Sequence, residues 1–235
     1  MVLFDKEIAQ IYDFWTTHGY YDYKKEAEII ARIIGNRKSI IELGIGTGNT
    51  AILLAKREYQ VSGIDDSPYM LSILADKLKK EKLDISFKQQ DLRELETDKK
   101  YDVALSAGGA FVYIQIDDNL FFDAYFSKQS EIETIFKRVF NLLNPNGLFL
   151  GNIQYHGKHF EFSLPDGTKY WFDLKEKSPK HLIKTHNFEK NGKIYLQKSY
   201  NFYRWTKNEI DDLAKKIGFQ VKEFDKSKSF YIFEK

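Results

Sequence analysis

The amino-acid sequence predicts an α/β fold in which a mainly parallel sheet is covered by helices on both faces. Between residues 40 and 143, short apolar runs of strand length alternate with longer segments whose apolar residues recur every three or four positions. Gly44, Gly46 and Gly48 separate the first apolar run from the helix-like segment that follows it. An Asn-Pro-Asn-Gly turn at 144–147 precedes a fifth apolar run. Such alternation of strands and helices is typical of βα units.

The composition predicts a soluble chain with one core and an elaboration. Apolar residues make up 43% of the 235 residues and aromatic residues 16%, and no apolar run approaches the roughly 20 residues that span a bilayer. Because the chain has no cysteine and no signal-like N-terminus, we expect a cytoplasmic protein without disulfides or a membrane partner. With 36 basic and 34 acidic residues, the net charge of +2 does not indicate a nucleic-acid partner.

The first 36 residues are expected to form a helical lid. Apolar side chains recur at helical spacing from residue 8 to 15 and again from residue 27 to 34. Between these helices lies a segment hinged at Gly19 and rich in tyrosine, including Tyr20 and Tyr21. These rings either pack between the two helices or face a ligand, and the sequence leaves both interpretations open.

The glycine-rich stretch at 40–50 predicts a ligand-binding turn between a strand and a helix. Glycines permit positive φ and, lacking Cβ, let a ligand approach the backbone N–H groups of the helix. A dinucleotide fingerprint requires a longer interval before its third glycine, and a P-loop requires Lys and Ser or Thr after its last glycine, so neither matches. Glu42 at the strand end would repel a pyrophosphate and attract an ammonium group. The ligand is therefore expected to carry an amine.

The second strand, at 60–66, ends in two acidic residues about 20 residues after the glycine turn, the separation typical of a ribose-binding carboxylate. We expect Asp65 to accept hydrogen bonds from both ribose hydroxyls. Asp66 either contacts the ligand or caps the next helix. Ser67 and Pro68 are suited to begin that helix, which continues through Met70.

The third and fourth strands, at 85–90 and 101–106, also end in residues suited to a site. Asp91 and Leu92 follow the third strand, and the small residues 107–110 follow the fourth. Ligands of open α/β sheets lie outside the carboxyl ends of the strands, so the turn at 107–110 should leave room beside the reacting group. Residues 111–128 are expected to form a long aromatic connection before a helix that ends near residue 143.

The segment 154–203 is expected to be an antiparallel β insertion after the fifth strand. It reads as alternating strands, with the hairpin signal Asn191-Gly192 between the last two. A helix capped by Thr206 and stopped by Gly218, then two short strands, complete the chain. We expect a single domain over 1–235, with a lid at 1–36 and an inserted sheet at 154–203 that either roofs the site or forms a homodimer face.

The residues from Glu42 to Gly48 resemble motif I of the class I S-adenosylmethionine (SAM) dependent methyltransferases, and Ile64 to Ser67 with Met70 resemble the second motif of that family. In layout, the chain is most similar to small-molecule N-methyltransferases of the amino-sugar or glycine type. The resemblance implies a Rossmann-like seven-stranded sheet with helices on both faces, an antiparallel C-terminal hairpin and a β insertion after strand five. It covers nearly the whole chain apart from residues 154–203.

The resemblance also implies the cofactor and its contacts. SAM would be the methyl donor and S-adenosylhomocysteine the product, with the methionine end on the glycine turn near Glu42, the ribose on Asp65 and the adenine amine on Asp91. The complete set of expected cofactor-binding residues is Glu42, Gly44, Gly46, Gly48, Asp65, Asp66, Met70, Asp91, Leu92, Ala107, Tyr12, Trp15 and Tyr20.

The expected chemistry is methyl transfer by in-line displacement to a small-molecule acceptor, with an amine nitrogen favoured over an oxygen. Holding and desolvating the acceptor can supply roughly 7 to 11 kcal/mol, so few catalytic groups are required. An amine must be unprotonated, and the candidates for removing its proton are His156 and His159 after strand five and Tyr21 in the lid. The two histidines are poorly spaced for metal ligation together with Glu161, so no metal is expected.

Two other functions remain open from the sequence. The chain could be an RNA or protein methyltransferase that binds its substrate through lysines and the aromatic insertion, or a SAM-binding module without catalysis. The turn at 107–110 lacks the acid or amide, two prolines and aromatic residue typical of enzymes that methylate exocyclic base nitrogens, which disfavours that substrate. The sequence does not identify the acceptor, because substrate residues lie on the variable elements of a fold.

Overall fold

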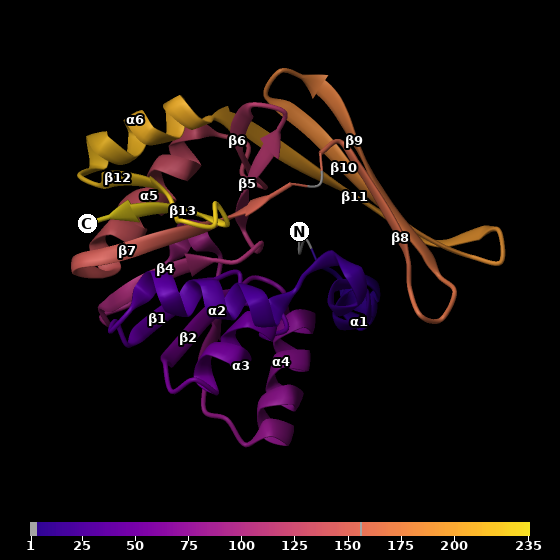
Figure 1. Ribbon diagram of the computed structural model, residues 1–235, viewed down its shortest axis with the longest axis horizontal. Coiled ribbons are helices and arrows are strands. Elements are labelled where there is room, and N and C mark those ends of the chain that lie inside the picture. Colours follow the sequence, from indigo (N-terminus) through magenta and orange to yellow (C-terminus); the bar gives the residue numbers. More distant parts are fainter. Residues whose placement is uncertain (1–3, 156) are drawn as a thin grey trace.

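The computed structural model describes residues 4–155 and 157–235 and contains a central sheet whose first five strands are parallel (Figure 1). These strands lie in the order β3-β2-β1-β4-β7, and the C-terminal strands continue the sheet through antiparallel pairing of β13 with β7 and of β12 with β13. Their bounds are β1 Ser39–Leu43, β2 Gln60–Asp65, β3 Ser86–Gln89, β4 Tyr101–Ser106, β7 Leu143–Gln154, β12 Gln220–Phe224 and β13 Phe230–Glu234. The expected Rossmann-like α/β fold class is confirmed.

Helices cover both faces of this sheet. Neighbouring residues of β1 point to opposite faces, since Ile40 belongs to the core cluster that contains residues of α2, α3 and α4, whereas Ile41 belongs to the cluster that contains residues of α5 and α6. Helix α4 begins as predicted, since the Ser67 hydroxyl accepts a hydrogen bond from Met70 N and Pro68 is the first helical residue. The helices are α1 Lys6–Trp15, a π-helical turn η1 Thr16–Tyr20, α2 Tyr23–Ile34, α3 Asn49–Ala55, α4 Pro68–Glu81, a 3₁₀ turn η2 Leu92–Glu94, α5 Gln129–Leu142 and α6 Lys207–Ile217.

Residues 111–124 form a β-hairpin, so the expectation of a long aromatic connection over 111–128 is wrong. Strands β5 (Phe111–Ile116) and β6 (Asn119–Ala124) pair around a tight turn at Asp117, whose φ is +52°. The aromatic side chains of this segment include the buried Phe111 and Phe122, which pack in the core beneath α5. Phe111 and Tyr113 are two residues apart and point to the same buried face, which is the period of a strand that the sequence analysis did not identify.

The expected antiparallel insertion is present and is continuous with the central sheet. Its strands are β8 (His159–Ser163), β9 (Lys169–Ser178), β10 (His181–Lys190) and β11 (Lys193–Thr206). The last four residues of β11 pair with β6, which joins these strands to β5 and β7. We call β8 to β11 the wing, because it extends to one side of the helices that cover the central sheet (Figure 1).

The N-terminal helices pack against the inner face of the wing. Trp15 and Tyr20 are buried against Tyr170, Phe172 and Phe188 in one aromatic cluster. Residues 4–20 are thus held between the wing and the central sheet. None of the helices in the described residues is both long enough and apolar enough to cross a membrane.

Candidate functional site

A cavity of about 930 Å³, including its mouth, lies at the carboxyl ends of the parallel strands. We call it the strand-end cavity. This position is the usual ligand site of open α/β sheets. Eight of the predicted cofactor-binding residues line it, namely Tyr12, Gly44, Gly46, Asp65, Asp66, Met70, Asp91 and Leu92.

The glycine turn presents bare backbone to this cavity. Gly44 and Gly46 have φ of +77° and +54°, in the region that favours glycine. A Cβ on Gly44 would lie 2.9 Å from the backbone nitrogen of Ala110. Gly48 has a different role, because it lies outside the cavity lining. A Cβ on Gly48 would lie 2.4 Å from Leu74 Cδ1, so this glycine permits the close approach of α3 and α4.

Asp65 is fixed by the backbone on both sides of the turn. Its Oδ2 accepts a hydrogen bond from Gly46 N at 2.8 Å, and its Oδ1 accepts one from Ser67 N at 2.9 Å. Burial nevertheless raises the pKa of Asp65 to about 6, and these two hydrogen bonds only partly oppose the effect. Each carboxylate oxygen retains capacity for a further hydrogen bond, as recognition of a diol requires.

Glu42 is buried at the end of β1 and is not one of the residues that line the cavity. Within the described residues, its Oε2 has no hydrogen-bond partner. Burial raises the pKa of Glu42 well above its ordinary value, and the nearby carboxylates of Glu26 and Asp65 raise it further. Glu26, which the sequence reading missed, has a pKa raised to about 7 by burial and accepts a hydrogen bond from Thr50 Oγ1 at 2.8 Å. Three carboxylates in one buried region would be stabilised by a cation.

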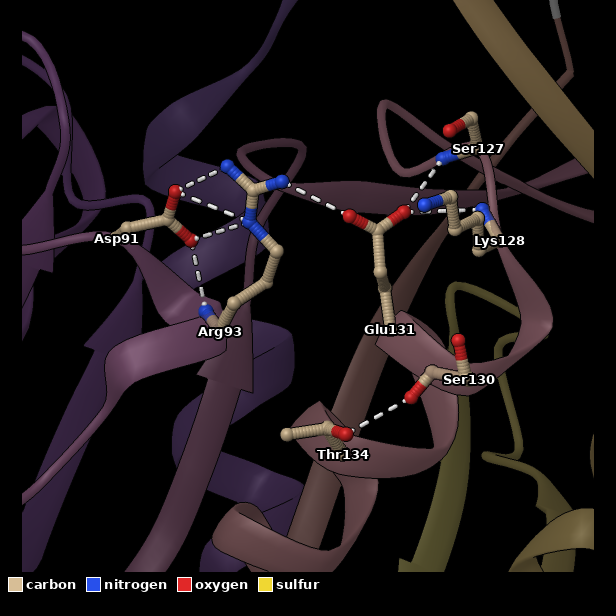
Figure 2. Close-up of polar contacts among 7 residues, drawn as sticks. All are labelled: Asp91, Arg93, Ser127, Lys128, Ser130, Glu131 and Thr134. Atoms are coloured by element: carbon tan, nitrogen blue, oxygen red, sulfur yellow. Dashed lines mark hydrogen bonds and ion pairs between the residues drawn. The ribbon is translucent and has the colours of Figure 1, made fainter.

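Arg93 forms ion pairs with Asp91 and with Glu131, and the second pair links the segment after β3 to α5 (Figure 2). The Arg93 guanidinium donates to both oxygens of Asp91 and, at 2.8 Å, to Glu131 Oε1. Glu131 in turn accepts a hydrogen bond from Lys128 N at the start of α5. Arg93 lowers the pKa of Asp91, so this carboxylate is charged at the cavity wall. Arg93 also lines the cavity, and its position two residues after Asp91 was the only signal in the sequence.

A second cavity, of about 700 Å³, lies between the N-terminal helices and the wing. We call it the wing cavity. It shares five lining residues with the strand-end cavity: Phe4, Tyr12, Gly108, Gly109 and Tyr125. The two cavities therefore adjoin at the small-residue turn after β4. Trp15 and Tyr20, predicted as cofactor residues, line the wing cavity rather than the strand-end cavity, and Ala107 lines neither.

The predicted proton acceptors differ in their placement. His156 lies outside the described residues. His159 is on β8, half exposed, with Nδ1 2.9 Å from Asp173 Oδ1, and it lines neither cavity. Tyr21 lines the wing cavity, where its hydroxyl accepts a hydrogen bond from Gln154 Nε2. Burial raises the pKa of Tyr21 well above its ordinary value, so its phenol is protonated at neutral pH.

The wing contributes polar residues that the sequence reading did not select. Lys184 and His186 both line the wing cavity from β10. His186 Nδ1 lies 2.8 Å from the Tyr170 hydroxyl, and burial lowers the pKa of His186 well below its ordinary value. The available signal was the two-residue period of a predicted strand, which places Lys184 and His186 on the same face as the apolar Leu182 and Phe188.

Polar contacts connect helix α1 to the glycine turn and to the helices α3 and α4. The Asp13 carboxylate on α1 accepts hydrogen bonds from Thr47 Oγ1 at 2.5 Å, Asn49 Nδ2 at 2.9 Å and Lys77 Nζ at 2.9 Å. Before α1, the Phe4 carbonyl accepts a hydrogen bond from Ser67 Oγ at 2.5 Å. The N-terminal segment is thus fixed over the strand-end cavity by residues of the turn and of α4.

Parts of the chain are similar in sequence to known proteins. Residues 40–147 match the family described as a methyltransferase domain. The chain is 32% identical over 161 residues to the putative methyltransferase YqeM of Bacillus subtilis and 30% identical over 99 residues to a carboxy-S-adenosyl-L-methionine synthase of Campylobacter jejuni. These matches cover 68% and 40% of this chain and only 59% and 42% of the two relatives.

Solved structures resemble the chain over nearly its full length. The CcbJ methyltransferase of Streptomyces caelestis has a TM-score of 0.76 at 20% identity, covering 99% of this chain and 97% of its own. DesVI of Streptomyces venezuelae has a TM-score of 0.75 at 16% identity, covering 96% and 97%. CalS10 of Micromonospora echinaspora, an amino pentose methyltransferase, has a TM-score of 0.73 at 14% identity, covering 96% of each chain. At these identities the likeness establishes the shared fold, including the wing.

Proposed function

We propose that this chain transfers a methyl group from SAM to a small-molecule acceptor, preferentially at an amine nitrogen. The match of residues 40–147 to the methyltransferase domain family and the fold shared with the CcbJ methyltransferase support this proposal. One observation carries this proposal: the strand-end cavity and the wing cavity meet at Gly108 and Gly109. A donor in the first cavity and an acceptor in the second would lie on either side of a turn without side chains.

The residues at the strand-end cavity fit SAM. Glu42 and Glu26 lie outside the cavity lining, but the orphaned oxygen of Glu42 and the nearby Glu26 carboxylate make the adjoining region favourable for the ammonium group of the methionine end. Gly44 and Gly46 leave backbone accessible, and Asp65 is held where its oxygens could accept from the ribose hydroxyls. When bound, SAM supplies a methyl group already activated by a sulfonium leaving group. The charged Asp91 on the wall suits the adenine amine.

The wing cavity would contribute catalysis by positioning and by excluding water. Its walls include the rings of Tyr12, Trp15, Tyr125 and Phe172, which hold an acceptor in an apolar environment. Burial in such a site favours the neutral form of an amine, the form that carries the nucleophilic lone pair. Positioning of this kind can account for roughly 7 to 11 kcal/mol of barrier reduction. Tyr21, as a protonated phenol, would orient the acceptor by hydrogen bonding, and His156 and His159 remain predictions as proton acceptors.

Transfer of tritium from labelled SAM into a panel of amines and hydroxylated metabolites tests the proposed activity. Binding of S-adenosylhomocysteine by calorimetry tests the donor site separately, with the double variant Gly46→Val, Asp65→Ala expected to abolish it. The matched control is Asp98→Ala in an exposed loop. Unchanged binding by the double variant would overturn the assigned site. Binding without turnover of any acceptor would instead indicate a non-catalytic module, and salt-sensitive retention of tRNA would indicate a nucleic-acid acceptor.

We also propose that the wing can mediate a homodimer. Strand β8 ends the strand order of the wing, so one edge of β8 is unpaired within the described residues. Light scattering of the wild-type chain and of a variant with proline in β8 would distinguish a dimer from a monomer. A wild-type monomer at micromolar concentration would exclude the proposal.

A further inference from the structure

A buried lysine lies in the wall of the wing cavity. Lys184 is only 9% exposed, and its Nζ donates a hydrogen bond to the Tyr20 hydroxyl at 2.9 Å. The same nitrogen lies 4.0 Å from the centroid of the Phe172 ring. In the described part of the chain, Lys184 forms no ion pair with a carboxylate. Its side chain therefore places a basic group in a mostly aromatic cavity.

The acidic residue of this cavity is already neutralised. Asp123 also lines the wing cavity, but its Oδ1 accepts from Arg204 Nε at 2.7 Å and its Oδ2 from Arg204 Nη2 at 2.6 Å. Both partners of this bidentate pair are buried. The local charges are thus one acid and two bases, and Lys184 is the unmatched base when it is protonated.

Packing alone does not explain a lysine at this position. Transferring a charged side chain from water into a protein interior costs several kcal/mol unless an opposite charge accompanies it. Burial accordingly lowers the pKa of Lys184 to about 7, with only partial opposition from the charge of Asp123. A methionine would fill the space between Tyr20 and Phe172 without this cost. A buried, perturbed base in a cavity is a candidate for ligand binding.

We propose that the acceptor carries an anionic oxygen group, a carboxylate or a phosphate, and that Lys184 binds it. This inference rests on the proposed function. Lys184 lines the wing cavity and not the strand-end cavity, so it would hold the acceptor from the side away from the donor. The aromatic walls would contact the apolar body of the acceptor. Its anionic group would supply the negative charge for Lys184, because the Asp123 carboxylate is paired with Arg204. The proposed substrates are therefore amino acids, amino-acid-like amines or phosphorylated amines.

Binding of three matched probes to the protein saturated with S-adenosylhomocysteine tests this inference. The probes are benzylamine, 4-(aminomethyl)benzoate and 4-(aminomethyl)phenylphosphonate, which share a benzylic amine and carry no anionic group, a carboxylate and a phosphonate, respectively. By calorimetry, we expect one of the two anionic probes to bind at least tenfold more tightly than benzylamine, and the better one identifies carboxylate or phosphate as the preferred group. Lys184→Met should abolish this preference, whereas Lys184→Arg should retain part of it.

The control variant is Lys190→Met on the same strand, whose Nζ pairs with Asp166 outside the cavity lining. It should keep the wild-type preference. Unchanged affinity of Lys184→Met for S-adenosylhomocysteine would show that this variant is folded. Failure of the wild type to bind S-adenosylhomocysteine would refute the proposed function. With that binding intact, equal affinities for all probes, no binding of any probe, or a preference that survives in Lys184→Met would each overturn the role of Lys184.

Discussion

Replacing Asp65 by asparagine should weaken the binding of S-adenosylhomocysteine about 10- to 150-fold. Asp65 is held by Gly46 N and Ser67 N at 2.8 and 2.9 Å, so its two oxygens have fixed directions. Asparagine retains one oxygen acceptor and places an NH₂ group at the other position. At least one hydrogen bond between a ribose hydroxyl and a charged acceptor is lost, and such a bond contributes roughly 1.5–3 kcal/mol. At about 1.4 kcal/mol for each factor of ten, this gives the stated range.

The pH dependence of the affinity for S-adenosylhomocysteine gives a second expectation for the same substitution. Burial raises the pKa of Asp65 to about 6, so its carboxylate is progressively protonated below that pH. If binding requires the charged form, the contribution of Asp65 to affinity falls about tenfold per pH unit below pH 6. The variant lacks this contribution, and the ratio of the two affinities should therefore shrink as the pH is lowered from 7 to 5.

As the pH rises, the stability of the free protein should fall, whereas the contribution of Asp65 to the affinity for S-adenosylhomocysteine should rise. The folded-state pKa of about 6 exceeds the ordinary 3.8, so the folded chain binds this proton more tightly than the unfolded chain. The stability associated with Asp65 is therefore greatest below pH 3.8 and falls as the pH rises to about 6, by up to about 3 kcal/mol. In Asp65→Asn this fall should be absent, which raises the stability of the variant relative to the wild type above pH 6.

Calorimetric titration with S-adenosylhomocysteine at pH 5, 6, 7 and 8, together with urea unfolding at the same pH values, measures both effects. Asp98→Asn in the exposed loop after β3 is the control and should match the wild type in both assays. Equal affinities of Asp65→Asn and the wild type at pH 7, or an affinity ratio that does not change between pH 7 and 5, would refute the assignment of Asp65 as a charged acceptor.

Three further substitutions test other parts of the site. Glu42→Gln should weaken S-adenosylhomocysteine binding about 10- to 100-fold while raising the stability of the free protein at pH 8, because an unpartnered buried carboxylate is removed; a loss of stability at pH 8 would argue against this reasoning. Asp13→Ala removes three hydrogen bonds that connect α1 to Thr47 in the glycine turn, Asn49 in α3 and Lys77 in α4. Amide exchange at 6–20 should therefore accelerate and the ligand should dissociate faster. Unchanged rates would show that the other contacts of the N-terminal helices hold them without Asp13. Gly48→Ala should lower the free energy of unfolding by about 2–4 kcal/mol, because the new Cβ adds strain at a positive φ and a clash with Leu74. The control Gly167→Ala, at a φ of +82° with open space around the glycine, should lower it by only about 1–2 kcal/mol. Equal decreases for the two variants in urea unfolding would exclude a contribution from the clash with Leu74.

Much of the fold follows from local rules of sequence. The parallel strands were correctly located by the alternation of apolar runs with segments of helical periodicity. The start of α4 was correctly located by the cap at Ser67, and the end of α6 by Gly218. The strand-end cavity was also predictable, because residues that follow parallel strands meet at one edge of the sheet. The aromatic segment at 111–124 was misread, since short apolar runs do not distinguish a buried hairpin from a connection.

The sequence by itself determined the strand-end cavity, because most of the residues that line it lie in short motifs whose spacing fixes their positions. Only the tertiary structure decided the wing cavity. Tyr21 before α2, Gly108 after β4 and Lys184 on β10 are far apart in the chain. They line one cavity because β11 pairs with β6 and so places the wing against the N-terminal helices. Register and long-range pairing of this kind depend on burial of whole faces rather than on local pattern. His159 lies half exposed on β8 and lines neither cavity, so its predicted role as a proton acceptor stays a prediction.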